Sequence, residues 1–264
     1  MNKDARPRPS FPAKLDSLSK PSLSALRSPK PPLVHKPGLQ PTIAASLRPD
    51  MGLDSEAVRR AMVQKLQVQG LRHANVAHAL MQVPRHQFVD SGLAAQAYED
   101  TSLPIGLEQT ISKPSVVARQ LELLLGGQAR LQGRVLEIGT GCGYQAALLS
   151  MLADEVYSIE RLRALHEKAI VNLRPFRLPN VHLILGDGML GYARGGPYVG
   201  IVCAAGGEDV PATWLSQLAV GGRLVAPVVT DGGQRLVVVQ RTQHGYERVV
   251  HEGVKFVPLK SGLA

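Results

Sequence analysis

The feature that most constrains the fold of this chain is the run from Val135 to Tyr144, which reads Val-Leu-Glu-Ile-Gly-Thr-Gly-Cys-Gly-Tyr. A buried-strand pattern breaks into alternate glycines, and a helical pattern follows. Glycines allow a sharp turn and let a ligand lie against the main chain, while the first N–H groups of a helix have no partner within it. We therefore predict a cofactor at this loop, bound by Glu137, Gly139, Thr140, Gly141 and Gly143.

Strand-like and helix-like segments alternate along the chain from the glycine loop onward. This alternation is typical of βαβ units, whose right-handed crossovers build a parallel sheet with helices on both faces. Beyond Val228, two further strand patterns are joined by glycine-containing turns. The prediction is an α/β fold with a doubly wound, mostly parallel sheet that ends in antiparallel strands. The expected strands are 134–138, 155–160, 181–185, 198–203, 223–228, 235–241 and 246–254, and the expected helices are 144–152, 162–174 and 211–218.

A helical stretch precedes the sheet. Its first helix is expected to be capped by Asp54 or Ser55 and to end at Gly70, and a second covers residues 75–82. A third begins near Pro114, with Ser112 two residues earlier as a candidate N-cap. We divide a single domain, 53–264, into a helical lead-in with a substrate-side segment (53–130), a cofactor-binding core (131–230) and C-terminal strands (231–264).

The first 50 residues differ in composition from the rest. They hold nine Lys or Arg against three Asp, with ten of the 19 prolines and seven serines. The extension thus carries +6 of the formal charge of +9, and residues 51–264 carry only +3. An electrostatic anchor, a polyproline ligand and a transit peptide are alternative interpretations. Because such a composition cannot bury enough apolar surface, we expect residues 1–52 to form a disordered, basic, Pro/Ser-rich extension.

Several classes of protein are disfavoured by the sequence. No apolar run approaches the roughly 20 residues that cross a bilayer, and the first residues lack the apolar core of a secretory signal. Cys142 and Cys203 are too few for a disulfide framework, and the histidines have no metal-binding spacing. We expect a cytoplasmic, monomeric protein with free thiols, no metal, no membrane association and no specific nucleic-acid partner.

The spacing of the glycines bears on the class of cofactor. A dinucleotide fingerprint needs its third glycine where this chain has Tyr144. A Gly-x-Gly-x-Gly loop after an acidic residue is instead typical of S-adenosylmethionine-dependent methyltransferases. Glu160 ends the next predicted strand and can accept both ribose hydroxyls, while Asp187, followed by Gly188, can accept from the adenine amino group. For each acid, a helix N-cap or a loop end is the alternative role.

Other segments carry a closer resemblance. Their sequences are Val-Pro-Arg-His-Gln-Phe-Val (83–89), Ala-Tyr-Glu-Asp (97–100), Leu-Pro-Ile-Gly (103–106), Gln-Thr-Ile-Ser-Lys-Pro (109–114) and Val-Lys-Phe-Val-Pro-Leu (254–259). Together with the glycine loop, they resemble the protein-L-isoaspartate O-methyltransferase family over about residues 55–264. The resemblance implies the methyltransferase type of doubly wound fold.

The resemblance also implies a reaction, which is methyl transfer from S-adenosyl-L-methionine to the α-carboxyl of L-isoaspartyl residues in damaged proteins. It places the active-site serine at Ser112, and a hydroxyl of Ser112 or Thr110 would hold the substrate carboxylate in line. That carboxylate is already ionised at neutral pH, so no general base is required. Ile111, Val257, Pro258 and Leu259 are the implied substrate-binding residues.

Three positions depart from the family pattern. Glu108 stands where a glycine is usual, Val199 where an aspartate is common, and Gly206 where a proline is usual. An acidic side chain near a site for a carboxylate weakens binding by repulsion. The alternative function is therefore a non-catalytic or weakly active S-adenosylmethionine-binding homologue that acts as an interaction protein. A methyltransferase for another carboxylate or for nucleic acid is a third hypothesis.

Overall fold

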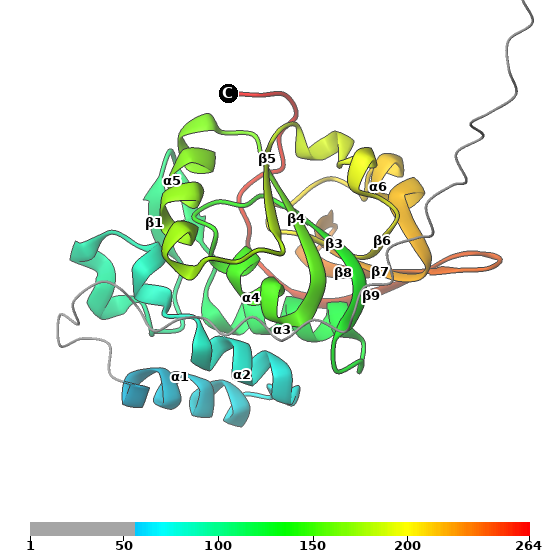
Figure 1. The fold of residues 1–264 in the computed structure, drawn as a ribbon. Helices are drawn as coiled ribbons and strands as arrows, with labels where there is room; N and C mark the ends of the chain where they lie inside the picture. Colours follow the sequence, from blue (N-terminus) through cyan, green and yellow to red (C-terminus); the bar gives the residue numbers. More distant parts are fainter. Residues whose placement is uncertain (1–55) are drawn as a thin grey trace, which may run out of the picture. The chain divides into compact units, whose positions relative to one another are not determined.

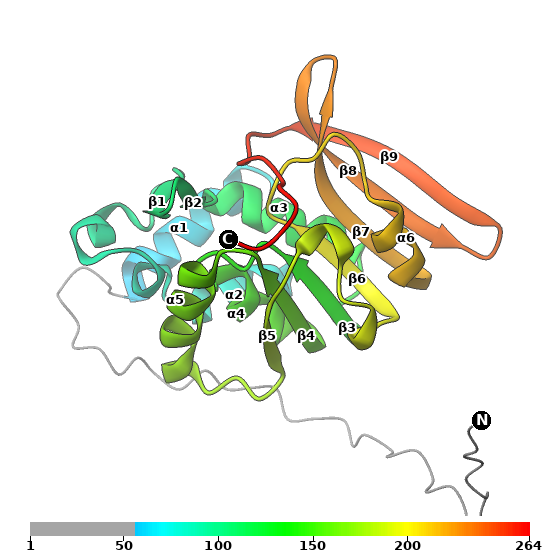
Figure 2. The same cartoon turned by 90° about the horizontal axis from the view of Figure 1, so that it is seen from above.

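The computed structural model describes residues 56–264. The predicted extension and the caps predicted at Asp54 and Ser55 lie outside the described residues. The described part is built on a seven-stranded sheet of order β5-β4-β3-β6-β7-β8-β9 (Figures 1 and 2). Strands β5, β4, β3, β6 and β7 pair in parallel, whereas β8 and β9 are antiparallel, which confirms the predicted fold class. The strands are β3 (Leu131–Ile138), β4 (Ala153–Glu160), β5 (Val181–Leu185), β6 (Tyr198–Cys203), β7 (Leu218–Thr230), β8 (Gly233–Thr242) and β9 (Gly245–Gly253).

The helices cover the two faces of this sheet unequally. In the view of Figure 1, α1 to α4 lie on the lower side of the sheet and α6 lies on its upper side. Apolar side chains of α1 to α5 form one core cluster, and Trp214 of α6 belongs to a second cluster on the other face. The α-helices are α1 (Glu56–Val68), α2 (Ala74–Gln82), α3 (Pro114–Leu125), α4 (Tyr144–Leu152), α5 (Arg163–Leu173) and α6 (Ala212–Gln217), and the short 3₁₀ segments are Arg85–Phe88, Ser91–Gln96, Arg174–Phe176, Gly188–Leu190 and Ala193–Gly195.

A two-stranded hairpin lies within the stretch that the sequence predicted to be helical. Strands β1 (Leu103–Gly106) and β2 (Gln109–Ile111) pair antiparallel outside the large sheet (Figure 2). Its two turn residues, Leu107 and Glu108, have φ values of +52° and +57°. Type I′ hairpin turns require positive φ at both central positions, for which Asn-Gly is the usual signal. Because this turn lacks that signal and its strands are short, residue patterning did not predict the hairpin.

The start of α3 is capped from outside the helix. Lys113 occupies the N-cap position without a side-chain cap, and Pro114 begins the helix as predicted. The main-chain N–H of Ser115 donates to Asp100 Oδ1 at 2.8 Å, so this acceptor is supplied by the segment before the hairpin. The interpretation of Ser112 as the N-cap is therefore wrong, because Asp100 takes that role.

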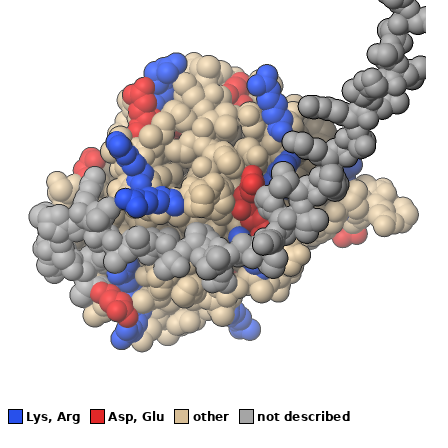
Figure 3. Space-filling model, viewed as in Figure 1, with Lys and Arg blue, Asp and Glu red and all other residues tan. Residues whose placement is uncertain are grey.

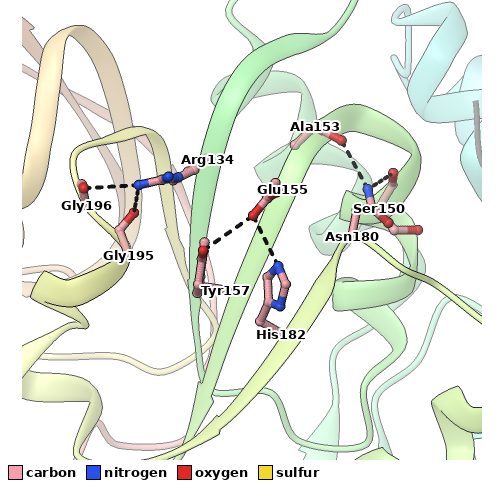
Figure 4. A network of polar contacts seen from close by, with 9 residues as sticks. All are labelled: Arg134, Ser150, Ala153, Glu155, Tyr157, Asn180, His182, Gly195 and Gly196. Atoms are coloured by element: carbon pink, nitrogen blue, oxygen red, sulfur yellow. Dashed lines mark hydrogen bonds and ion pairs between the residues drawn. The ribbon is translucent and has the colours of Figure 1, made fainter. Parts of the chain in front are cut away.

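A polar network ties strands together at the end of the sheet opposite the glycine loop (Figure 4). Glu155 Oε2 accepts from the Tyr157 hydroxyl at 3.3 Å and lies 3.1 Å from His182 Nε2. Asn180 Nδ2 donates to two carbonyl oxygens at the end of α4, and Arg134 donates to two carbonyl oxygens before β6. These contacts join β4 to β5 and β3 to the loop before β6, and the opposite ends of these strands carry the site.

Candidate active site

The glycine loop turns the chain from β3 into α4. Gly139, Gly141 and Gly143 have φ values of +90°, +56° and +91°, which side chains of L-residues rarely adopt. Gly143 is the N-cap of α4, where a Cβ atom would come within 3.0 Å of Leu173. The alternation of glycine in the sequence is thus required by the backbone, and it leaves the main chain of residues 139–141 open to a cavity.

That cavity has a volume of about 600 Å³ and lies where β3 and β4 end. Most of its lining comes from the β1–β2 hairpin, from the ends of the parallel strands with the helix starts that follow them, and from the C-terminal segment. All but two of the residues predicted from the sequence contribute to its wall; Gly143 and Asp187 do not. The predicted residues in the wall are Thr110, Ile111, Ser112, Glu137, Gly139, Thr140, Gly141, Glu160, Gly188, Val257, Pro258 and Leu259.

Glu160 is held rigidly at the end of β4. Its Oε2 accepts from the Gly141 N–H at 2.9 Å, and its Oε1 accepts from the Leu162 N–H at 2.9 Å. The residue is 5% exposed. Each carboxylate oxygen has a second lone pair, so both oxygens can still accept from a ligand in the cavity. This carboxylate is arranged to accept from two hydroxyl groups, as a ribose would present.

Glu137 lies fully buried at the wall of the same cavity. The Ser158 hydroxyl donates to its Oε2 at 2.5 Å, and that hydroxyl is also 2.6 Å from Thr140 Oγ1. Burial is the main cause that raises the pKa of Glu137 to about 8; the hydrogen bond from Ser158 opposes this shift, and the nearby charge of Glu160 contributes to it. Among the described residues, none donates to Glu137 Oε1. A buried acceptor without a donor fits a ligand that brings an N–H or O–H group, as S-adenosylmethionine does with its amino group.

Asp187 is engaged by the main chain instead of facing the cavity. Its Oδ1 accepts from the Met189 N–H at 2.8 Å, and its Oδ2 accepts from the Gly262 N–H at 2.7 Å. The adjacent Gly188 does line the cavity, and a Cβ there would lie 2.6 Å from Ile138 Cγ2. The alternative role of an N-cap therefore describes Asp187 as it stands, and its contact with adenine stays a prediction.

The acceptor side of the cavity brings the hairpin and the C-terminal segment together. Ser112 is half-buried and Thr110 is exposed, and both follow or belong to β2. At the C-terminal segment, the Gly206 N–H donates to the Val257 carbonyl at 2.8 Å and the Leu259 N–H donates to the Gly206 carbonyl at 2.8 Å. The hydroxyl groups and an apolar segment thus line the same cavity, and Gly206, shortly after β6, holds that segment in place.

The three residues that depart from the family pattern lie in different parts of the structure. Glu108 lines the cavity. Val199 lies near the amino end of β6, where its Cγ1 is 2.9 Å from the position of a Cβ on Gly133. Gly206 uses its N–H for the C-terminal segment, and a proline would lack that donor. Only Glu108 of the three is therefore placed to affect a substrate directly.

Residue patterning missed several residues of the cavity wall. Tyr144 and Gln145 form the first turn of α4, and Arg161 and Arg163 follow Glu160. Gln145 is 7% exposed, and its Nε2 has no acceptor among the described residues. The sequence could have indicated Tyr144 and Gln145, because they directly follow the last glycine of the loop. For the arginines the sequence carried no signal, because charged residues after a strand are usually solvated.

The two cysteines are unreactive in this environment. Both are buried and neither is in a disulfide. Burial raises the pKa of Cys142 to about 11 and that of Cys203 to about 12, so both remain thiols at neutral pH. Among residues 56–264 there is no cluster of three or more His, Cys, Asp or Glu side chains that could hold a metal. In the same part of the chain, no helix is long and apolar enough to cross a membrane.

The mostly parallel sheet, the glycine loop after β3 and the acidic end of β4 define the class of S-adenosylmethionine-dependent methyltransferases. The chain belongs to the Protein-L-isoaspartate(D-aspartate) O-methyltransferase (PCMT) family, whose model matches residues 57–264. This confirms the resemblance drawn from the sequence.

Relatives and solved structures agree with this assignment. A protein-L-isoaspartate O-methyltransferase of Methylibium petroleiphilum is 53% identical over 272 residues, 99% of each chain. One of Leptothrix cholodnii is 54% identical over 249 residues, 91% of this chain and 87% of its own. A solved protein-L-isoaspartate O-methyltransferase superposes with a TM-score of 0.70 at 29% identity, covering 78% of this chain and 67% of its own. A second solved structure, from Plasmodium falciparum and in complex with S-adenosyl-L-homocysteine, has a TM-score of 0.66 and covers 76% of this chain and 98% of its own. Because it is only 21% identical, it supports the fold alone.

Proposed function

We propose that this chain is a protein-L-isoaspartate(D-aspartate) O-methyltransferase. It transfers the methyl group of S-adenosyl-L-methionine to the α-carboxyl of L-isoaspartyl residues in damaged proteins or peptides, which begins their repair. The observation that carries this conclusion is 53% identity along 99% of a relative with that name. The cavity supports it, because the glycine loop and the Ser112 segment line one continuous space.

The cofactor half of the cavity is formed by the glycine loop and the ends of β4 and β5. S-adenosylmethionine supplies, when bound, an electrophilic methyl group on a cationic sulfur. We assign the ribose hydroxyls to Glu160 and the amino group to Oε1 of Glu137, which has no donor among the described residues. We assign the adenine to Gly188, which lines the cavity, and to Asp187, which precedes it in the sequence. Gly139, Thr140, Gly141 and Gly143 shape the loop that lets the main chain approach the ligand.

The acceptor half is formed by β2 and the C-terminal segment. A substrate carboxylate is ionised at neutral pH and attacks the methyl group directly, so the protein needs to orient it and not to deprotonate it. We assign this orientation to the hydroxyls of Ser112 and Thr110. Ile111, Val257, Pro258 and Leu259 line the same side and exclude water from the reacting groups.

Further properties of the chain are proposals of the same kind. We propose a monomeric, cytoplasmic enzyme with one methyltransferase domain over 53–264 and no specific nucleic-acid partner. On the described face in Figure 3, Lys and Arg side chains are interspersed with Asp and Glu, and they do not form a continuous basic surface. The described part of this face therefore lacks the clustered cations that give affinity for a phosphate backbone.

The remaining alternative, a binding protein without turnover, rests on Glu108 because Val199 and Gly206 lie outside the cavity wall. One assay decides between the two functions. The full chain is incubated with labelled cofactor and two peptides that differ only in aspartate or isoaspartate at one position. We expect base-labile label in the isoaspartyl peptide alone, and a strong loss of label with Ser112→Ala at unchanged affinity for S-adenosylhomocysteine. Cofactor binding without label in either peptide would favour the binding protein.

A further inference from the structure

The C-terminal segment Ser261–Ala264 lies along the rim of the cofactor cavity. In Figure 2 the end of the chain reaches α5 and β5, which are far from it in the sequence. The Ala264 N–H donates to the Arg161 carbonyl at 3.0 Å, and the Arg163 N–H donates to the Ala264 carbonyl at 2.9 Å. These two bonds pair the segment with the loop between β4 and α5. Ala264 and the preceding Lys260 both belong to the cavity wall.

The side chain of Arg161 fastens the middle of the segment. Its Nε donates to the Gly262 carbonyl at 2.9 Å, and its terminal nitrogen donates to the Ser261 carbonyl at 3.4 Å. Arg161 directly follows Glu160, the proposed ribose acceptor, and lines the cavity itself. The guanidinium therefore connects the C-terminal segment to the part of the wall where the nucleoside is assigned.

Asp187 holds the same residue from the other side. Its Oδ2 accepts from the Gly262 N–H at 2.7 Å, so the main chain of Gly262 is bound at its N–H by Asp187 and at its carbonyl by Arg161. Gly262 has a φ of +77°, a conformation that favours glycine. Bonds from charged side chains are stronger than neutral ones. Two opposite charges thus clamp one residue between the ends of β4 and β5.

We infer that Arg161 and Asp187 are positioning residues that fasten Ser261–Ala264 as a closing wall of the cofactor site, and that release of this segment controls cofactor exchange. The inference rests on the proposed function for the identity of the cofactor. It also gives Asp187 a second role beside the proposed contact with adenine, because its two oxygens have further lone pairs.

The inference has a consequence for the rate at which the ligand dissociates. If the ligand leaves only when the segment is released, its dissociation rate is proportional to the fraction of molecules in the released state. Arg161 makes two hydrogen bonds to the segment, of which one is long and both are near solvent. We expect their removal to raise the fraction of molecules in the released state about tenfold. The dissociation rate should rise by the same factor.

The test measures release of labelled S-adenosylhomocysteine, chased with excess unlabelled compound, from the full chain and from variants. The variants are Arg161→Ala, a deletion of residues 261–264, and the two combined. Arg194→Ala is the control for the loss of an arginine charge, because Arg194 is exposed and lies outside the cavity wall. Arg161→Lys keeps the charge and one donor. Thermal unfolding of each variant reports whether it is folded.

We expect about tenfold faster release from Arg161→Ala and from the deletion, an intermediate rate from Arg161→Lys, and little change from Arg194→Ala. Because both changes act on one contact, the combined variant should release no faster than the deletion alone. Equal release rates in all chains, or an undiminished effect of Arg161→Ala in the deleted chain, would overturn the inference while leaving the proposed function intact. A folded wild type that binds no S-adenosylhomocysteine would overturn both.

Discussion

At the scale of single residues, the main electrostatic feature of the site is the buried carboxyl of Glu137. Its Oε2 is bound by Ser158, and its Oε1 is buried without a donor from the described residues. When this carboxyl is ionised, its burial as a charge costs free energy. When it is neutral, it is a weaker hydrogen-bond acceptor for a ligand. Such a carboxyl favours a cationic partner, because a positive charge repays the cost of ionisation.

The raised pKa of Glu137 predicts a pH-dependent stability of the ligand-free protein. Between the ordinary pKa of 4.5 and the folded value of about 8, the folded state binds more protons than the unfolded state. The free energy of unfolding should therefore fall as the pH rises, by up to about 1.4 kcal/mol per pH unit from this group. Glu137→Gln removes the group with little change in shape, so urea unfolding of both chains at about pH 5.5 and about pH 7.5 isolates this contribution. A difference between the chains that does not change with pH would contradict the prediction.

At the scale of elements, patterning predicted the sheet well and the hairpin not at all. The helix Tyr144–Leu152 and the strands Val181–Leu185 and Tyr198–Cys203 have the predicted bounds, because each is a mostly apolar run between turn residues. The β1–β2 hairpin is short, contains a proline and turns at Leu107–Glu108. Ile105 and Ile111 of its strands are buried, whereas both turn residues are exposed, so no local pattern indicates the turn.

The hairpin turn supplies a prediction in which strain and charge are separable. Glu108→Gly should raise the free energy of unfolding by about 1 kcal/mol, because glycine accepts the positive φ at low cost. It should also lower the KM for an isoaspartyl peptide by removing a like charge at the cavity, with a smaller gain at high salt. Glu108→Gln is the control, since it removes the charge but keeps the side chain. It should reproduce the gain in KM without the gain in stability.

The opposite outcome for this turn is equally specific. A higher KM in both variants would mean that the Glu108 carboxylate binds substrate, for example by accepting from a peptide N–H. A higher KM in Glu108→Gly alone would mean that the side chain orders the turn. Either result would contradict the repulsion between Glu108 and the substrate carboxylate.

At the scale of the whole molecule, the site is assembled from three regions of the sequence. The hairpin, the ends of the parallel strands and the C-terminal segment meet at one cavity. Motifs identified the members of each region, because glycines and acids at strand ends have a fixed place in a parallel sheet. The contact of Asp187 with Gly262 joins residues 75 positions apart, and no local pattern predicts such a pair. Sequence analysis therefore identified residues in each region of the cavity wall but not how its C-terminal part is held.

The last prediction concerns the division of the chain into an extension and a domain. The cavity wall is formed between Ile105 and Ala264, and the family model matches from residue 57. Deleting residues 1–50 should therefore leave the affinity for S-adenosylhomocysteine and the turnover of a short isoaspartyl peptide within about twofold of the full chain. Calorimetry and the methylation assay measure the two quantities on matched preparations. Turnover on a large damaged protein is measured in parallel, because a basic extension of charge +6 can attract acidic substrates at low salt. A loss of turnover confined to the protein substrate would assign the extension to substrate capture, whereas a loss on the short peptide would show that it contributes to the site.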